Sequence, residues 1–139
     1  MLKDKKVLAL ELCEKISKAT DKFRKVQARQ MFEQKLTSPQ FGVLEILYNS
    51  GSLSLKKISD EMMVTGANIT CVVDNLEKEG FVKRTHSKED RRVILADLTD
   101  SGRHKIESIL PEYYKNISAM VSSLSENEQM TVINLLDKF

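Results

Sequence analysis

The spacing of the apolar residues changes from helical to strand-like close to Gly80, and this change restricts the possible folds more than any other feature of the chain. Before it, apolar residues recur at three- and four-residue steps, the spacing of amphipathic helices. Residues 81–86 and 93–98 instead have the pattern of two strands, joined by the polar turn 87–92. Helical spacing returns after Thr99. The sequence therefore predicts a mainly α-helical protein with one small β-hairpin.

Capping residues give the order of the helices. The first covers residues 7–32, the fourth covers 66–79, and Gly80 is the natural stop of the fourth. Leu53 is a lone apolar residue ahead of the short third helix. The starts of the second to sixth helices are predicted from polar residues that suit an N-cap. These are Ser38 (followed by Pro39), Ser54, Thr65, Thr99 and Ser125.

Length and composition point to one small globular domain. The 139 residues include 41% hydrophobic and 30% charged residues, with no apolar run as long as the roughly 20 residues of a membrane span. Two cysteines and the absence of a signal peptide predict a cytoplasmic protein that does not engage a membrane. The helix 7–32 is longer than a domain of this size can cover, so we expect part of its apolar face to pack on another chain.

The third and fourth helices, joined by a tight turn at Val64 and followed by a hairpin, predict a helix-turn-helix with a wing. Short polar or small side chains near the start of the second helix suit entry into the DNA major groove, although an ordinary surface helix has a similar face. The candidates for base or phosphate contact on this helix are Thr65, Ala67, Asn68, Thr70, Cys71 and Asn75.

The hairpin is the second candidate for DNA contact. Residues 81–105 carry 7 Lys or Arg against 4 Asp or Glu, and Lys88, Arg91 and Arg92 lie together at the tip. An arginine there fits the minor groove, and Asp90 is near enough in sequence to hold the Arg92 guanidinium. Lys83 and Arg84 on the first strand could contact phosphate. The alternative is a polar turn that is simply solvated.

No set of residues supports catalysis or a cofactor. The two histidines, His86 and His104, form no metal-binding or nucleophile motif, and no glycine-rich phosphate loop occurs. We therefore expect neither an enzyme nor a metal site. Cys13 is a candidate redox thiol, but a buried, inert core residue is the simpler interpretation. The side chains of Met62, Met63, Met120 and Phe23 are also expected in the core.

The chain resembles the MarR family of bacterial winged-helix regulators along nearly its whole length. The most specific match is Asp90-x-Arg92, a strand, and then Leu98-Thr99-x-x-Gly102. Residues 66–82 are similar to the recognition helix of the family and its exit into the wing, and residues 38–47 to its second helix.

This resemblance implies a single domain, 1–139, that forms a homodimer through helices in 1–35 and 100–139, with a winged helix-turn-helix in 36–99. It further implies a repressor bound to a pseudo-palindromic double-stranded DNA operator, with Arg92 in the minor groove and Asp90 positioning it. Release would follow binding of a small aromatic or phenolic ligand at residues the sequence does not identify.

The alternatives are a redox repressor that uses Cys13 and a winged helix that binds protein instead of DNA. The peroxide-sensing branch of the family pairs its cysteine with tyrosines, whereas this chain has no tyrosine before Tyr48. Many members also carry an arginine in the first half of the recognition helix, where this chain has Gly66 and Cys71. Base specificity is therefore expected from Asn68, Thr70 and Asn75.

Overall fold

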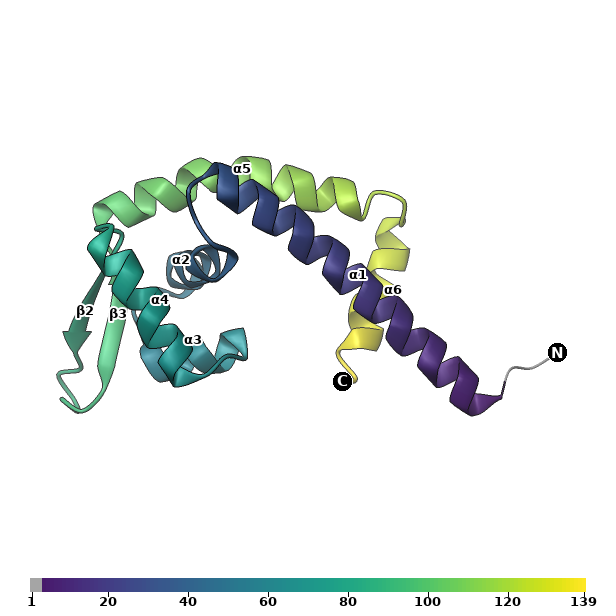
Figure 1. Ribbon diagram of the computed structural model, residues 1–139, viewed down its shortest axis with the longest axis horizontal. Helices are drawn as coiled ribbons and strands as arrows, with labels where there is room; N and C mark the ends of the chain where they lie inside the picture. The colour runs from purple at the N-terminus through teal and green to yellow at the C-terminus, as the bar shows by residue number, and fades with distance from the viewer. Residues whose placement is uncertain (1–3) are drawn as a thin grey trace. The chain divides into compact units, whose positions relative to one another are not determined.

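A computed structural model describes residues 4–139; residues 1–3 of the predicted N-terminal dimerisation segment lie outside the described part. The elements are α1 (Lys5–Glu33), α2 (Ser38–Ser50), β1 (Leu53–Ser54), α3 (Leu55–Met62), α4 (Gly66–Lys78), β2 (Val82–His86), β3 (Ile94–Leu98), α5 (Asp100–Met120) and α6 (Glu126–Leu136) (Figure 1). The predicted fold class, mainly helical with a small antiparallel sheet, is confirmed.

The chain divides into two compact units. One comprises the described residues up to Gln27 together with Pro111–Phe139, and the other is Ala28–Leu110. The second unit holds the helix-turn-helix and the sheet. None of the helices among residues 4–139 is long and apolar enough to cross a membrane.

Side-chain caps fix where the helices begin. Ser54, Thr65 and Ser125 cap α3, α4 and α6 as expected. The prediction that Ser38 caps α2 is wrong by one residue, because Thr37 is the N-cap. The Thr37 hydroxyl accepts from the Gln40 amide at 3.2 Å, and the Gln40 side chain accepts from the Thr37 amide at 2.9 Å. This reciprocal pair satisfies two donors that the helix start would leave free.

The sheet has a third strand that sequence reasoning missed. Its order is β1-β3-β2, with both pairings antiparallel. Leu53, taken as a lone apolar residue, pairs with Ala96, and Ser54 pairs with Leu95. Two residues are too few to show an alternating pattern, so only the tertiary pairing reveals β1. The short strand covers one edge of β3, and β2 and β3 extend beyond it as the wing.

The two units differ sharply in their cores. Every buried hydrophobic residue among those described lies in Ala28–Leu110, where Phe41, Leu44, Ile69 and Leu76 are fully buried. In the other unit, apolar side chains of α1 and α6 stay open to solvent; Leu12 is 54% exposed. They line an apolar groove of about 430 Å³. A single chain therefore provides a core for the winged helix but not for the unit formed by its ends.

A close contact fixes the point where the wing leaves the helices. Thr99 donates from its amide to the Phe81 carbonyl at 3.1 Å and from its hydroxyl to the Gly80 carbonyl at 2.6 Å. Gly102 is buried against the same segment, where an added Cβ would lie 2.9 Å from the Phe81 carbonyl carbon. Glycine at 102 thus allows α5 to start against the residue that leads into β2.

Candidate nucleic-acid interface

Helix α4 presents the predicted contact residues on one exposed face. Ile69, Val73 and Leu76 are fully buried and anchor the opposite face in the core. The exposed residues include all six predicted on this helix and its cap, namely Thr65, Ala67, Asn68, Thr70, Cys71 and Asn75. The structure therefore brings these side chains together on one surface of the winged-helix unit.

Two threonine hydroxyls on this helix make local hydrogen bonds. Thr65 is the N-cap, and its hydroxyl accepts from the Asn68 amide at 3.2 Å. The Thr70 hydroxyl donates to the Gly66 carbonyl at 3.0 Å, one turn earlier. Thr70 has thus used its single hydroxyl proton within the helix, while Thr65 keeps its own.

Arg84 lies in an ion-paired cluster that joins the wing to α4. Its guanidinium contacts Asp74 at 2.6 Å and Glu77 at 3.1 Å, and its backbone amide donates to Glu77 at 3.0 Å. The hydrogen bonds from Arg84 hold the pKa of the Glu77 carboxyl below its ordinary value. The Arg84 side chain is only 28% exposed, so the structure places it between two protein carboxylates and not at the open surface.

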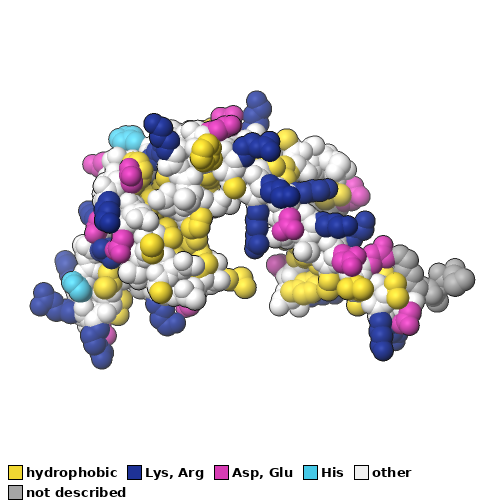
Figure 2. Space-filling model, viewed as in Figure 1, with side chains coloured by type: hydrophobic (Ala, Val, Ile, Leu, Met, Phe, Trp, Pro, Cys, Tyr) yellow, Lys and Arg dark blue, Asp and Glu magenta, His cyan; other side chains and the backbone are white. Residues whose placement is uncertain are grey.

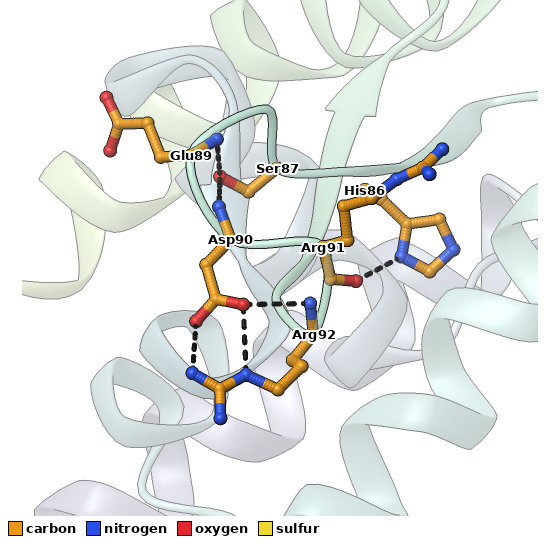
Figure 3. A network of polar contacts seen from close by, with 6 residues as sticks. All are labelled: His86, Ser87, Glu89, Asp90, Arg91 and Arg92. Atoms are coloured by element: carbon orange, nitrogen blue, oxygen red, sulfur yellow. Dashed lines mark hydrogen bonds and ion pairs between the residues drawn. The ribbon is translucent and has the colours of Figure 1, made fainter.

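Arg92 is the opposite case, an arginine held in place yet fully accessible at the wing tip (Figure 3). Asp90 accepts from Arg92 Nε and Nη2, both at 3.0 Å, and from the Arg92 backbone amide at 3.1 Å. These hydrogen bonds hold the pKa of the Asp90 carboxyl below its ordinary value. The Arg92 side chain is 91% exposed. The expected pairing of Asp90 with Arg92 is present in the structure.

Two further residues shape the wing turn and were not singled out from the sequence. His86 Nδ1 lies 2.8 Å from the Arg91 carbonyl, and because a carbonyl only accepts, Nδ1 carries the proton. The Ser87 hydroxyl accepts from the amides of Glu89 and Asp90 at 3.3 and 3.4 Å. A histidine five residues before its partner has no distinctive sequence signal, whereas a serine that opens a polar turn does.

Basic side chains surround this turn. Lys88 and Arg91 lie in the turn and Lys83 near the start of β2; all three are exposed. Figure 2 shows Lys and Arg side chains gathered about the tip of the hairpin. No ion pair is recorded for these three among residues 4–139. The wing thus offers several free cations beside the positioned Arg92.

The turn between α3 and α4 contributes an unexpected apolar residue. Met63 has a φ of 56° and is 91% exposed, so its predicted place in the core is wrong. Met63 ends α3 in the left-handed conformation, which turns its side chain away from the helix pair. Val64 beside it is 37% exposed.

The other candidate residues have no site around them. Cys13 and Cys71 are exposed free thiols, so the simpler interpretation of Cys13 as a buried core residue is wrong for the single chain. Within residues 4–139, no three His, Cys, Asp or Glu side chains lie close enough to hold a metal ion.

Comparison with known proteins gives a consistent result. A profile of the MarR family matches residues 36–94. The HTH-type transcriptional regulator YkoM of Bacillus subtilis is 37% identical over 99 residues, which are 71% of this chain but only 64% of YkoM. The transcriptional repressor MdtR of the same organism is 34% identical over 119 residues, covering 84% of this chain and 77% of MdtR. A MarR variant from E. coli, solved with operator DNA, has a TM-score of 0.85 at 21% identity over 98% of both chains.

Proposed function

The chain belongs to the MarR family of transcriptional regulators, and on that basis we propose that it is a homodimeric repressor of a pseudo-palindromic DNA operator, released by a small molecule. The observation that carries the DNA-binding part is the wing tip, where Arg92 is both held by Asp90 and 91% exposed. A solvated turn has no need of two side-chain hydrogen bonds that hold an exposed cation. An arginine that enters a narrow groove does, because these hydrogen bonds remove rotamer freedom before binding.

The proposal gives each element a part in binding. Helix α4 enters the major groove, with Ala67, Asn68, Thr70, Cys71 and Asn75 towards the bases, and Thr65 at the phosphate-facing start of the helix. Arg92 enters the minor groove, while Lys83, Lys88 and Arg91 contact phosphates. Arg84 holds the wing against α4 through its ion pairs with Asp74 and Glu77.

A second copy of the chain is the proposed partner of the unit formed by the ends of the chain. Among its described residues none is buried, and its groove is lined almost wholly by apolar side chains from α1 and α6. Contiguous apolar surface of this kind marks an interaction site. The segments 1–35 and 100–139 are accordingly proposed as the dimerisation helices, flanking the DNA-binding region 36–99.

Fluorescence anisotropy on duplexes from the DNA upstream of its own gene tests the proposal. The wild type should bind saturably, more tightly than to random duplex, and less tightly as salt rises. Arg92→Ala should weaken binding, whereas Arg24→Ala, which removes an exposed arginine of α1, should not. Equal affinity for specific and random DNA, with no effect of Arg92→Ala, would favour a winged helix that binds protein.

The effector part rests on family membership. We propose a small aromatic or phenolic ligand, and a panel of benzoates and phenols added to the bound duplex tests for release. The second candidate is a redox switch at Cys13, favoured by the exposure of its thiol. If hydroperoxide releases the operator from the wild type and from Cys71→Ser but not from Cys13→Ser, the redox mechanism holds. Equal release from Cys13→Ser excludes it.

A further inference from the structure

The first half of α4 has no charged side chain. Residues 66–73 are all neutral, and the first charges on the helix, Asp74 and Glu77, are ion-paired with Arg84. Lys78 follows Gly66 by twelve positions, a rise of roughly 18 Å along the helix axis. It lies beyond the N-terminal turns that enter a major groove. No arginine or lysine of α4 is therefore placed to read a base edge.

The missing cations restrict which bases α4 can recognise. Guanine shows two acceptors, O6 and N7, in the major groove, and bidentate recognition of them requires the paired donors of arginine or lysine. Adenine shows one acceptor, N7, and one donor, the N6 amino group, which match the carboxamide of asparagine. The face carries two such carboxamides, Asn68 and Asn75. Both are exposed and have no recorded side-chain partner within residues 4–139.

Two other exposed side chains of the helix, Ala67 and Thr70, offer methyl groups and no free donor. Ala67 presents only its methyl. Thr70 has committed its hydroxyl proton to the Gly66 carbonyl at 3.0 Å, so it cannot donate to a base and retains a methyl group. The thymine C5-methyl is the apolar feature of the major groove that such groups contact.

We propose that α4 recognises A·T base pairs, with Asn68 and Asn75 on adenine edges and with Ala67 and Thr70 against thymine methyl groups. The inference rests on the proposed function, because it names the sequence class of the DNA at that site. Under this proposal, the wing and α4 have different parts in binding. The wing cations supply most of the sequence-independent attraction, and exposed uncharged side chains of α4 supply the discrimination.

Selection from duplexes randomised over about two helical turns identifies the sequence class. The proposal expects half-sites in which the positions facing α4 are A·T, and in which replacing one such pair by G·C weakens binding roughly 5- to 150-fold. Modified bases then locate the contacts. Deoxyuridine removes the thymine methyl and 7-deazaadenine removes N7, and each should cost roughly fourfold to fivefold at a contacted position.

Double-mutant cycles connect each modified base to one side chain. Thr70→Ser keeps the hydroxyl bond to Gly66 and removes only the methyl, so deoxyuridine at its partner position should cost this variant nothing further. Asn68→Ala should likewise lose its sensitivity to 7-deazaadenine. Asn49→Ala removes an exposed carboxamide at the end of α2 and should respond like the wild type.

The outcomes separate the two levels of the argument. Specific half-sites with G·C pairs at the positions facing α4, or indifference to every deoxyuridine and 7-deazaadenine, would overturn the A·T inference and leave the proposed DNA-binding function intact. Enrichment of no sequence at all would overturn the proposed function and this inference with it.

Discussion

Replacing Gly102 by alanine should destabilise the winged-helix unit because the new methyl group has no room. The ideal Cβ would lie 2.9 Å from the Phe81 carbonyl carbon, 3.1 Å from its Cα and closer still to its oxygen. All three are backbone atoms, and the same carbonyl accepts from the Thr99 amide at 3.1 Å. The neighbour therefore cannot give way as a flexible side chain would.

The size of the effect follows from two opposing terms. Relief of the clash needs a backbone shift, for which overpacking costs of about 1–3 kcal/mol are typical. Alanine is better than glycine within a helix by roughly 0.5–1 kcal/mol, which offsets a small part. We expect the upper end of the first range to prevail, a net loss of about 2 kcal/mol, since the obstacle is backbone.

Gly66→Ala is the matched control. Gly66 begins α4, has nothing within 4 Å of an added Cβ and does not have a positive φ. Its replacement should leave stability unchanged or raise it by up to about 1 kcal/mol. Urea unfolding followed by circular dichroism at one fixed protein concentration compares the variants.

The reasoning is refuted if Gly102→Ala unfolds at the same urea concentration as the wild type. The start of α5 could then accommodate a Cβ at position 102, contrary to the close contact with the Phe81 backbone. If Gly102→Ala is destabilised but Gly66→Ala equally so, the loss reflects the substitution type and not the contact.

Three further predictions test other parts of the molecule. Arg84→Gln should weaken operator binding at every salt concentration without changing the slope of log affinity against log salt, because Arg84 is paired within the protein. Lys83→Gln removes a free cation, so it should reduce the magnitude of that slope by about 1 for each phosphate contact that is lost. Leu136→Glu places a charge in the apolar groove of each protomer of a symmetric dimer. The dimer dissociation constant, measured by sedimentation velocity, should rise at least about 100-fold. Thr131→Glu changes an exposed polar position of α6 and should leave the dissociation constant unchanged. Burial raises the pKa of Glu45 above 4.5, so the folded state binds this proton more tightly than the unfolded state, and the free energy of unfolding falls as pH rises from 4.5 through the raised value. Glu45→Gln should therefore stabilise the protein at neutral pH and remove this part of the pH dependence, and an unchanged profile of unfolding free energy against pH would contradict the assignment.

Local chemistry explains what the sequence predicted well. Thr65 and Gly80 bound α4 as expected because capping and a positive φ are decided by a few neighbouring residues. The helical and strand periods gave the fold class for the same reason. Met63 was misplaced because a residue other than glycine gives no sequence signal for the left-handed conformation that carries its side chain outward. The strand β1 was missed because its two residues are a strand only through their pairing with β3.

The candidate site shows the same limit at the level of single side chains. Arg84 and Arg92 are both arginines of a basic hairpin, and the sequence predicted that both would contact DNA. Arg84 has its carboxylates on a different element, Asp74 and Glu77 of α4, and the pairing draws it to 28% exposure. Arg92 has its carboxylate two residues away in the same turn and remains 91% exposed.

The two arginines differ in where their ion-pair partners lie: those of Arg84 are on another element, and that of Arg92 is in the same turn. A guanidinium has five N–H donors, and Arg92 gives Asp90 only its Nε and one from Nη2, which leaves three donors facing solvent in a fixed direction. A partner within the same turn thus orients the arginine without covering it. A partner on a neighbouring helix, as for Arg84, ties two elements together and removes the cation from the surface. In a basic hairpin, an acidic residue two positions before an arginine therefore favours an arginine that is oriented but still exposed. Carboxylates on the preceding helix favour an arginine that joins the hairpin to that helix.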